Sequence, residues 1–337
     1  MKKLFSYIFV AFITLPFLTL GISCNSCQSK KNTTETVIET YTKIAPDFNA
    51  DSAYAYVEKQ VNFGPRVPST PEHIACGDYL SKKLKEFGAN VTEQKTTVKH
   101  YNGKNLPIRN IIGSYLPENP NRLLLYAHWD SRPFADHDTD ISKQNQPILG
   151  ADDGASGVGV LLEVARQLKA KQPNVGIDII FFDLEDWGQA DFDKNIVEGD
   201  WWCVGSQYWA KNPHTPNYKA RFGILLDMVG AGDATFLKEG YSAEYASNIV
   251  EKVWMMAAKL GYSTAFVNQT GGYVMDDHVP VIQNNRAPSA DIINTKQNIN
   301  TGFAPHWHTH KDNMDIINKD MLKKVGETIL EVIYNEK

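Results

Sequence analysis

The stretch LLLYAHWD, residues 123–130, is an apolar run that ends in a histidine and an aspartate. Two further runs, IDIIFF at 177–182 and FGILL at 222–226, have the same form, and each is followed directly by an aspartate. Continuous apolar runs of this length are typical of parallel strands that are buried on both faces. The spacing of apolar residues predicts a helix over 155–169, between the first two runs. We therefore predict an α/β fold, a single doubly wound domain with a mostly parallel central sheet flanked by helices.

Capping and turn residues extend this pattern on both sides. Asp51 predicts the start of a helix that runs to about residue 63, and Thr70-Pro71-Glu72 predicts another that ends at Gly88. The remaining predicted elements are strands at 90–99 and 107–116 and helices at about 242–260 and 318–335. The sequence contains neither a repeat nor a second hydrophobic core, so residues 50–337 are predicted to form one catalytic domain.

The composition excludes several classes of protein. The 337 residues are 42% hydrophobic, with 23 glycines and 16 prolines, which is incompatible with a disordered or collagen-like chain. Lys and Arg number 34 against 39 Asp and Glu, and the net charge of −5 leaves no basic surplus for nucleic acid. Four cysteines are too few for a disulfide scaffold of this size.

The N-terminal residues have the form of a secretion signal. Lys2 and Lys3 precede an apolar run, and Gly-Ile-Ser at 21–23 precedes Cys24, as in a bacterial lipoprotein signal. We expect residues 1–23 to be a lipoprotein signal peptide, Cys24 to be lipidated on a membrane, and residues 24–49 to be a tether. The expected location is the bacterial cell envelope. Plain secretion and an uncleaved anchor are the alternatives.

Acidic and imidazole side chains follow the predicted strands on their carboxyl side. Open α/β sheets bind ligands at this edge. Carboxylates and imidazoles that converge in one cleft suit zinc, with one position left open for substrate. The residues concerned are His128, Asp130, Asp152, Asp153, Glu185, Asp186, Asp227, Asp276, Asp277, His278 and His308.

As a set, five motifs resemble the M28 family of zinc aminopeptidases, which includes the glutaminyl cyclases. The motifs are Tyr126-Ala-His-Trp-Asp130, Gly150-Ala-Asp-Asp-Gly-Ala-Ser-Gly157, Phe181-Phe-Asp-Leu-Glu-Asp186, Leu225-Leu-Asp227 and Trp307-His-Thr309. The resemblance covers about residues 50–335. It implies a zinc aminopeptidase-like fold and an enzymatic function.

The resemblance also implies a role for individual residues. Asp153, Asp186 and His308 match the zinc ligands, and Glu185 matches the general acid/base. In the two-metal aminopeptidases, His128 and Asp227 would hold a second zinc that Asp153 bridges. In the cyclases that second site is generally empty, and the residue matching Asp227 acts through hydrogen bonds.

Two acidic residues in these motifs, Asp152 and Asp186, differ from the metal ligands usual in the family. Asp152 matches no ligand and is expected to be structural. The chain has Glu185-Asp186 where animal cyclases and most M28 peptidases have Glu-Glu. Aspartate is still a competent zinc ligand, but its side chain is shorter by one methylene, so the metal or its strand is expected to shift slightly.

Three details favour a cyclase over a peptidase. Asp276 adds a second acid before Asp277-His278, and it could share a proton with Asp227 as a catalytic pair. Trp307 directly precedes His308, as in the cyclase motif. Additional indoles, Trp187, Trp201 and Trp202, lie near the same edge, and we expect Trp307, Trp202 and Trp187 to line a pocket for a glutaminyl side chain. His278, Cys76 and Cys203 are expected to be structural.

We therefore predict a zinc-dependent glutaminyl cyclase that acts on peptides or proteins with an N-terminal glutamine. One zinc is expected. The first alternative is an M28-type aminopeptidase with two zincs, and the remote alternative is an inactive surface binding protein. The sequence leaves the oligomeric state open.

Overall fold

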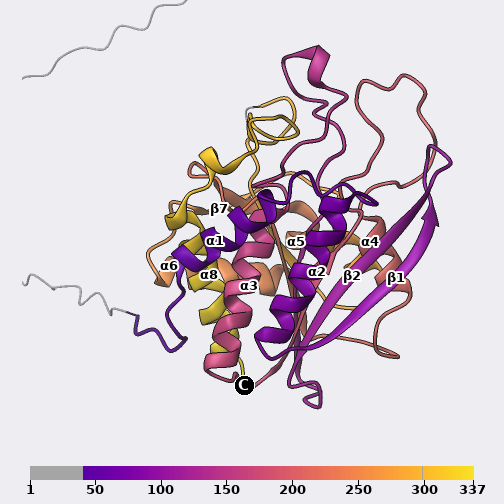
Figure 1. The fold of residues 1–337 in the computed structure, drawn as a ribbon. Helices are drawn as coiled ribbons and strands as arrows, with labels where there is room; N and C mark the ends of the chain where they lie inside the picture. The colour runs from indigo at the N-terminus through magenta and orange to yellow at the C-terminus, as the bar shows by residue number, and fades with distance from the viewer. Residues whose placement is uncertain (1–40, 298) are drawn as a thin grey trace, which may run out of the picture. The chain divides into compact units, whose positions relative to one another are not determined.

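The computed structural model describes residues 41–297 and 299–337 (Figure 1). The predicted signal peptide, Cys24 and most of the predicted tether lie outside these residues. Within the described part of the chain, no helix is long and apolar enough to cross a membrane.

The centre of the fold is a six-stranded mixed sheet, in the order β1-β2-β4-β3-β5-β8. The pairs β4–β3, β3–β5 and β5–β8 are parallel, and β1–β2 and β2–β4 are antiparallel. A separate parallel pair joins β6 and β7. The strands are β1 Asn90–Lys99, β2 Asn105–Tyr115, β3 Arg122–His128, β4 Gly176–Phe182, β5 Phe222–Asp227, β6 Phe236–Lys238, β7 Phe266–Thr270 and β8 Ser289–Ile293.

Helices cover both faces of the sheet, as expected for a doubly wound fold. The larger core cluster contains side chains of α1, α2, α3, α6 and α8, and Figure 1 looks onto this face. The smaller cluster contains side chains of α4 and α7. The helices are α1 Ala50–Val61, α2 Pro71–Glu86, α3 Ala155–Ala170, α4 Val204–Lys211, α5 Gly240–Tyr245, α6 Ser247–Lys259, α7 His278–Gln283 and α8 Lys319–Tyr334, with short 3₁₀ turns at η1 Ile141–Lys143 and η2 Met314–Ile316.

The central strands are almost entirely apolar because they supply both cores. In β3, Leu123 and Leu125 belong to the larger cluster, whereas Leu124 and Tyr126 belong to the smaller one. Successive side chains of a strand point to opposite faces, so every position of such a strand is buried. This is the physical reason that the continuous apolar runs predicted the parallel strands correctly.

Three local predictions need correction. The side chain of Asn49, not Asp51, caps α1 by accepting from the backbone N–H of Ser52 at 2.9 Å. The predicted helix at 242–260 is two helices, α5 and α6, which meet at Ala246. Strand β8 was not predicted, because its five residues, SADII, include two polar side chains.

The segment at residues 41–49 is attached to α8 by buried carboxylates. Glu331 accepts from the backbone N–H groups of Ile44 at 3.0 Å and Ala45 at 3.1 Å, and from the hydroxyl of Tyr41 at 2.8 Å. Lys43 forms an ion pair of 2.9 Å with Glu327, one turn earlier on the same helix. The chain therefore enters the domain along α8.

Candidate active site

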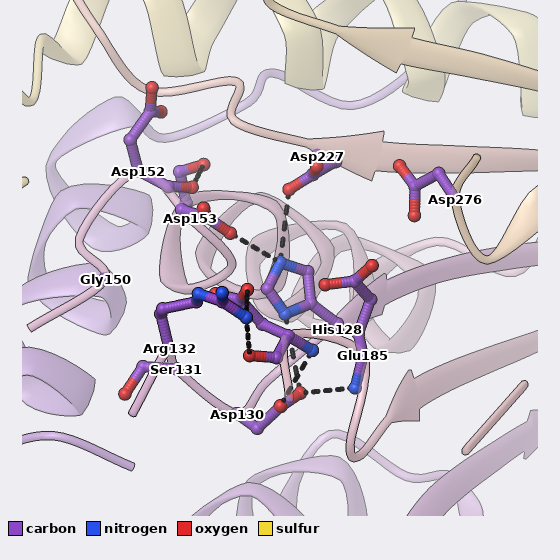
Figure 2. Close-up of polar contacts among 12 residues, drawn as sticks. His128, Asp130, Ser131, Arg132, Gly150, Asp152, Asp153, Glu185, Asp227 and Asp276 are labelled. Atoms are coloured by element: carbon purple, nitrogen blue, oxygen red, sulfur yellow. Dashed lines mark hydrogen bonds and ion pairs between the residues drawn. The ribbon is translucent and has the colours of Figure 1, made fainter. Parts of the chain in front are cut away.

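The carboxyl ends of β3, β4 and β5 meet at one edge of the sheet, and each ends in a polar side chain. His128 ends β3, Glu185 follows β4, and Asp227 ends β5. Asp153 lies just before α3 and points at the imidazole of His128 (Figure 2). The edge predicted from the sequence therefore carries a cluster of buried titratable groups.

The first group of possible metal ligands is Asp153, Asp186 and His308. Nε2 of His308 lies 3.2 Å from Oδ1 of Asp186 and 3.7 Å from Oδ2 of Asp153. One ligand atom from each residue lies within 4.8 Å of the others, and all three residues are buried. Burial, and then the charge of Asp153, raises the pKa of Asp186 to about 6.

The second group is His128, Asp153 and Asp227, so Asp153 belongs to both. Nε2 of His128 lies 3.0 Å from Oδ1 of Asp153 and 3.2 Å from Oδ1 of Asp227. Figure 2 shows both carboxylates at the same nitrogen of the imidazole. Burial opposes a charge on His128, but the three surrounding aspartates, Asp130 included, raise its pKa well above the ordinary value.

The ligands of the first group are held by a second layer of carboxylates. Asp130 accepts from the backbone N–H groups of Glu185 and Asp186, both at 3.2 Å, which fixes the loop after β4. Asp136 lies 3.2 Å from Nδ1 of His308 and is itself paired with Arg132. Such partners set the orientation of a metal-binding imidazole and increase its basicity.

Asp152 has the structural position expected of it. Its carboxylate accepts from the backbone N–H groups of Gly230 at 2.7 Å and Ala231 at 3.2 Å, and it contacts Nε2 of His306 at 3.0 Å. Asp312 in turn accepts from the backbone N–H of Asp152 at 2.7 Å. These bonds hold the turn that presents Asp153.

Glu185 is buried beside both groups and contacts a residue that the sequence did not connect with it. Burial, followed by the charge of nearby acids, raises the pKa of Glu185 well above the ordinary value. A carboxyl group with a raised pKa suits proton transfer near neutral pH. The thiol of Cys203 lies 3.2 Å from Oε1 of Glu185, although the sequence predicted only a packing role for that cysteine.

Asp227 and Asp276 form the acidic side of the site. Burial is the main cause that raises the pKa of each to about 7, and the charge of Asp227 contributes to the shift of Asp276. Oδ2 of Asp276 is buried and has no hydrogen-bond partner among the described residues. His278, nearby in sequence, contacts Glu239 at 2.9 Å and Asp291 at 3.7 Å and does not line the cavity.

A cavity of about 910 Å³ opens onto the cluster, and two of the predicted tryptophans line it. Trp307 stacks on the ring of His308, with centroids 3.7 Å apart, and Trp202 lies parallel to that ring at 6.1 Å. Trp187 does not line this cavity. Its side chain is buried with Leu106, Ile108 and Leu184.

The donor set of the first group fits zinc. Two carboxylates and an imidazole are common zinc ligands, and three protein ligands leave a position open for substrate. Both carboxylate oxygens of Asp186 are buried without a hydrogen-bond partner among the described residues. Buried polar atoms are normally paired, and a metal ion would supply the missing partner.

Comparisons with known proteins agree with this geometry. The model of peptidase family M28 matches residues 110–333. The structure of a Zn-dependent exopeptidase from Parabacteroides distasonis is 58% identical, covers 87% of this chain and 100% of its own, and has a TM-score of 0.86. The structure of a glutaminyl cyclase from Tannerella forsythia is 57% identical with the same coverage and a TM-score of 0.85.

A more distant curated relative is aminopeptidase YwaD of Bacillus subtilis. It is 28% identical over 261 residues, which make up 74% of this chain. The match spans about half of that relative, 50% of its length.

Proposed function

The chain belongs to peptidase family M28, and from this premise we propose that it is a zinc-dependent glutaminyl-peptide cyclotransferase. The proposed reaction converts the N-terminal glutamine of a peptide or protein to pyroglutamate and releases ammonia. The full-length similarity to a glutaminyl cyclase supports this reaction, although a structure of equal similarity bears the name of an exopeptidase.

The observation that carries the proposal is the contrast between the two ligand groups. In the first, Nε2 of His308 lies 3.2 Å from Oδ1 of Asp186, but neither oxygen of Asp186 has a hydrogen bond of good geometry with the described residues, as expected for a residue that binds a metal. In the second, the imidazole of His128 lies within hydrogen-bonding distance of both carboxylates. This contrast favours one zinc, held by Asp153, Asp186 and His308, and a second group that works through hydrogen bonds.

The proposed mechanism uses the residues around that zinc. When bound, zinc supplies a Lewis acid for the γ-carboxamide oxygen of the substrate. Glu185 accepts a proton from the α-amino group, whose nitrogen forms a bond to the carbonyl carbon of the side-chain amide, Cδ. The bond from Cδ to the amide nitrogen breaks, and Glu185 returns the proton to this nitrogen, which leaves as ammonia.

The remaining groups position the substrate. Asp227 and Asp276 form an acid pair that orients the leaving nitrogen through hydrogen bonds. Trp202 and Trp307 enclose the compact glutaminyl side chain in the inner part of the cavity. Attack is intramolecular, so the site mainly has to hold the near-attack geometry.

An aminopeptidase is the second candidate, and the composition of the second group favours it. One ligand atom each from His128, Asp153 and Asp227 lies within 4.8 Å of the others, which is also compatible with a zinc. In that reaction Glu185 would take a proton from a water molecule, and the N-terminal residue would be released.

The cellular setting is also part of the proposal. We propose that the enzyme is held at a membrane of the bacterial cell envelope by a lipid on Cys24. The residues between Cys24 and the attached segment at 41–49 would be the tether, which is shorter than the 24–49 predicted from the sequence. Its substrates are then peptides or proteins outside the cytoplasm that begin with glutamine.

One experiment separates the two candidates. The purified protein is given a peptide that begins with glutamine and one that begins with leucine, and its zinc content is measured. We expect ammonia from the first peptide, intact second peptide and about one zinc per chain. Released leucine with about two zincs would contradict the cyclase. Glu185→Gln should lower kcat by about 100-fold or more while zinc stays bound.

A further inference from the structure

Cys203 is a buried free thiol in direct contact with the proposed acid/base. Its side chain is 1% exposed, and its sulfur lies 3.2 Å from Oε1 of Glu185. Within residues 41–297 and 299–337, no other side chain donates a hydrogen bond to the carboxylate of Glu185. Cys203 does not line the cavity, whereas Glu185 does. The thiol therefore contacts the carboxylate from the protein side.

The thiol is the donor of this hydrogen bond. Burial, and then the charge of Glu185, raises the pKa of Cys203 well above its ordinary value. The sulfur therefore keeps its proton, and a thiol is a weak donor to a carboxylate oxygen. An S–H bond directed at Oε1 engages one of the two carboxylate oxygens and leaves the other for the substrate.

The backbone holds the thiol and the carboxylate in fixed register. The N–H of Cys203 donates to the carbonyl of Glu185 at 3.0 Å, and the N–H of Val204 donates to the carbonyl of Leu184 at 2.9 Å. The carbonyl of Cys203 accepts from Gln207 at 2.9 Å, in the first turn of α4. The start of this helix is thus tied to the loop that carries Glu185.

The conformation of Cys203 argues that its side chain is needed. Its φ of 54° lies in the left-handed region, which is strained for a residue with a side chain and costs glycine almost nothing. A cysteine at this position therefore destabilises the turn relative to glycine. The contact of its sulfur with Glu185 supplies a reason for having a side chain there.

We propose that Cys203 is a positioning residue for Glu185: its thiol donates to Oε1 and holds the carboxylate in the rotamer that transfers the proton. The inference rests on the proposed function only in that Glu185 moves a proton, which both the cyclase and the aminopeptidase reactions require. A residue with this role acts on the rate of the chemical step, and it leaves substrate binding and the zinc ligands unchanged.

The test compares variants with and without a donor at position 203. We expect Cys203→Ala to lower kcat about tenfold, through the loss of one hydrogen bond to Glu185, with KM changed less than about twofold. Cys203→Ser keeps a donor and should retain kcat within about threefold of the wild type. Zinc content should be the same in all three proteins.

Two further variants keep the test decisive. Cys203→Gly suits the left-handed backbone and lacks a donor, so it replaces Cys203→Ala if alanine prevents folding. Cys76→Ala is the matched control, because Cys76 is also a buried free thiol but lies on α2 within the larger core. We expect it to keep the kcat of the wild type.

The outcomes are distinct. The proposal is overturned if a donor-free variant keeps wild-type kcat, if serine loses as much as alanine, or if KM changes in place of kcat. Failure of the cyclase itself shows separately, because the wild type would then release leucine from the leucine peptide. The kcat values of the Cys203 variants would then be compared for the release of leucine.

Discussion

The two ligand groups share Asp153 and nearly the same composition, yet they are supported differently. In the first group, Asp136 faces Nδ1 of His308, and Asp130 holds the backbone N–H of Asp186. Nε2 of His308 lies 3.2 Å from Oδ1 of Asp186, but neither oxygen of Asp186 has a hydrogen bond of good geometry with the described residues. In the second, Nε2 of His128 makes a hydrogen bond of 3.2 Å with Asp227 and also lies 3.0 Å from Asp153. The difference shows that residue types alone do not specify a metal site. The partners behind the ligands and the atoms left unpaired distinguish the two groups.

The largest effect should come from replacing the histidine of each group. We expect His308→Ala to lower zinc affinity more than about 100-fold, because it removes one of three protein ligands. His128→Ala should change the affinity for the first zinc by no more than about threefold, because the first group stays intact. Zinc content after dialysis against a weak chelator, with circular dichroism to check folding, measures both. Equal zinc loss in the two variants would mean that the groups do not differ in this way.

A smaller effect should follow from weakening the support of His308. Asp136→Asn removes the negative charge that faces Nδ1 of His308, and we expect zinc affinity to fall about 10- to 100-fold. Asp138→Asn is the control in the same loop, because Asp138 contacts His310 at 2.9 Å and none of the proposed ligands. Competition with a zinc-binding dye gives both affinities. If the Asp136→Asn protein binds zinc with wild-type affinity, Asp136 does not contribute to zinc binding by the first group.

The smallest effect should come from replacing Asp276, one of the two residues on the acidic side of the site, and it concerns the free energy of unfolding. The pKa of Asp276 is raised from 3.8 to about 7, mainly by burial. Between these values the folded protein keeps a proton that the unfolded chain has lost, so this residue lowers stability as pH rises. We therefore expect Asp276→Asn to raise the free energy of unfolding of the zinc-free protein by about 1–2 kcal/mol at pH 8.

The pH dependence separates this cause from a change in packing. At pH 4 most of the gain from Asp276→Asn should disappear, because this pH lies near the unfolded pKa of 3.8, below which both the folded and the unfolded wild type keep the proton. Asp47→Asn is a control at an exposed carboxylate, whose side chain is 92% exposed. Denaturant unfolding at the two pH values measures each protein. A gain at pH 4 equal to that at pH 8 would show that charge is not its cause.

Much of the fold was predictable because burial on both faces leaves a strong pattern. The runs at 123–127 and 177–182 have no polar residue except Asp178, whose charge is paired with Arg122 at 2.7 Å. Strand β8 carries Ser289 and Asp291 in five residues, so its pattern is ambiguous. The break at Ala246 was also hidden, because alanine has a high helix propensity and yet its backbone here leaves the helical conformation, with φ −141° and ψ 34°.

The candidate site was predictable in its residue types but not in its supports. The strand ends and the resemblance predicted that Asp153, Asp186 and His308 would converge, and the structure brings them together. Asp136 and Asp312 gave no signal, because a lone aspartate in a loop is usually a turn or cap residue. The contact of Cys203 with Glu185 joins residues 18 apart through a left-handed turn that no local pattern announces.

The attachment of residues 41–49 to α8 has a mechanical consequence. Tension applied to the N-terminal side of the domain reaches the fold first through Glu331, which binds Ile44 and Ala45, and then through the long helix α8. Neither this carboxylate nor the segment it holds lines the catalytic cavity. We therefore expect a pulling force on the N-terminal end of this segment to act on α8, at the side of the sheet. The distances between Asp153, Asp186 and His308 should not change.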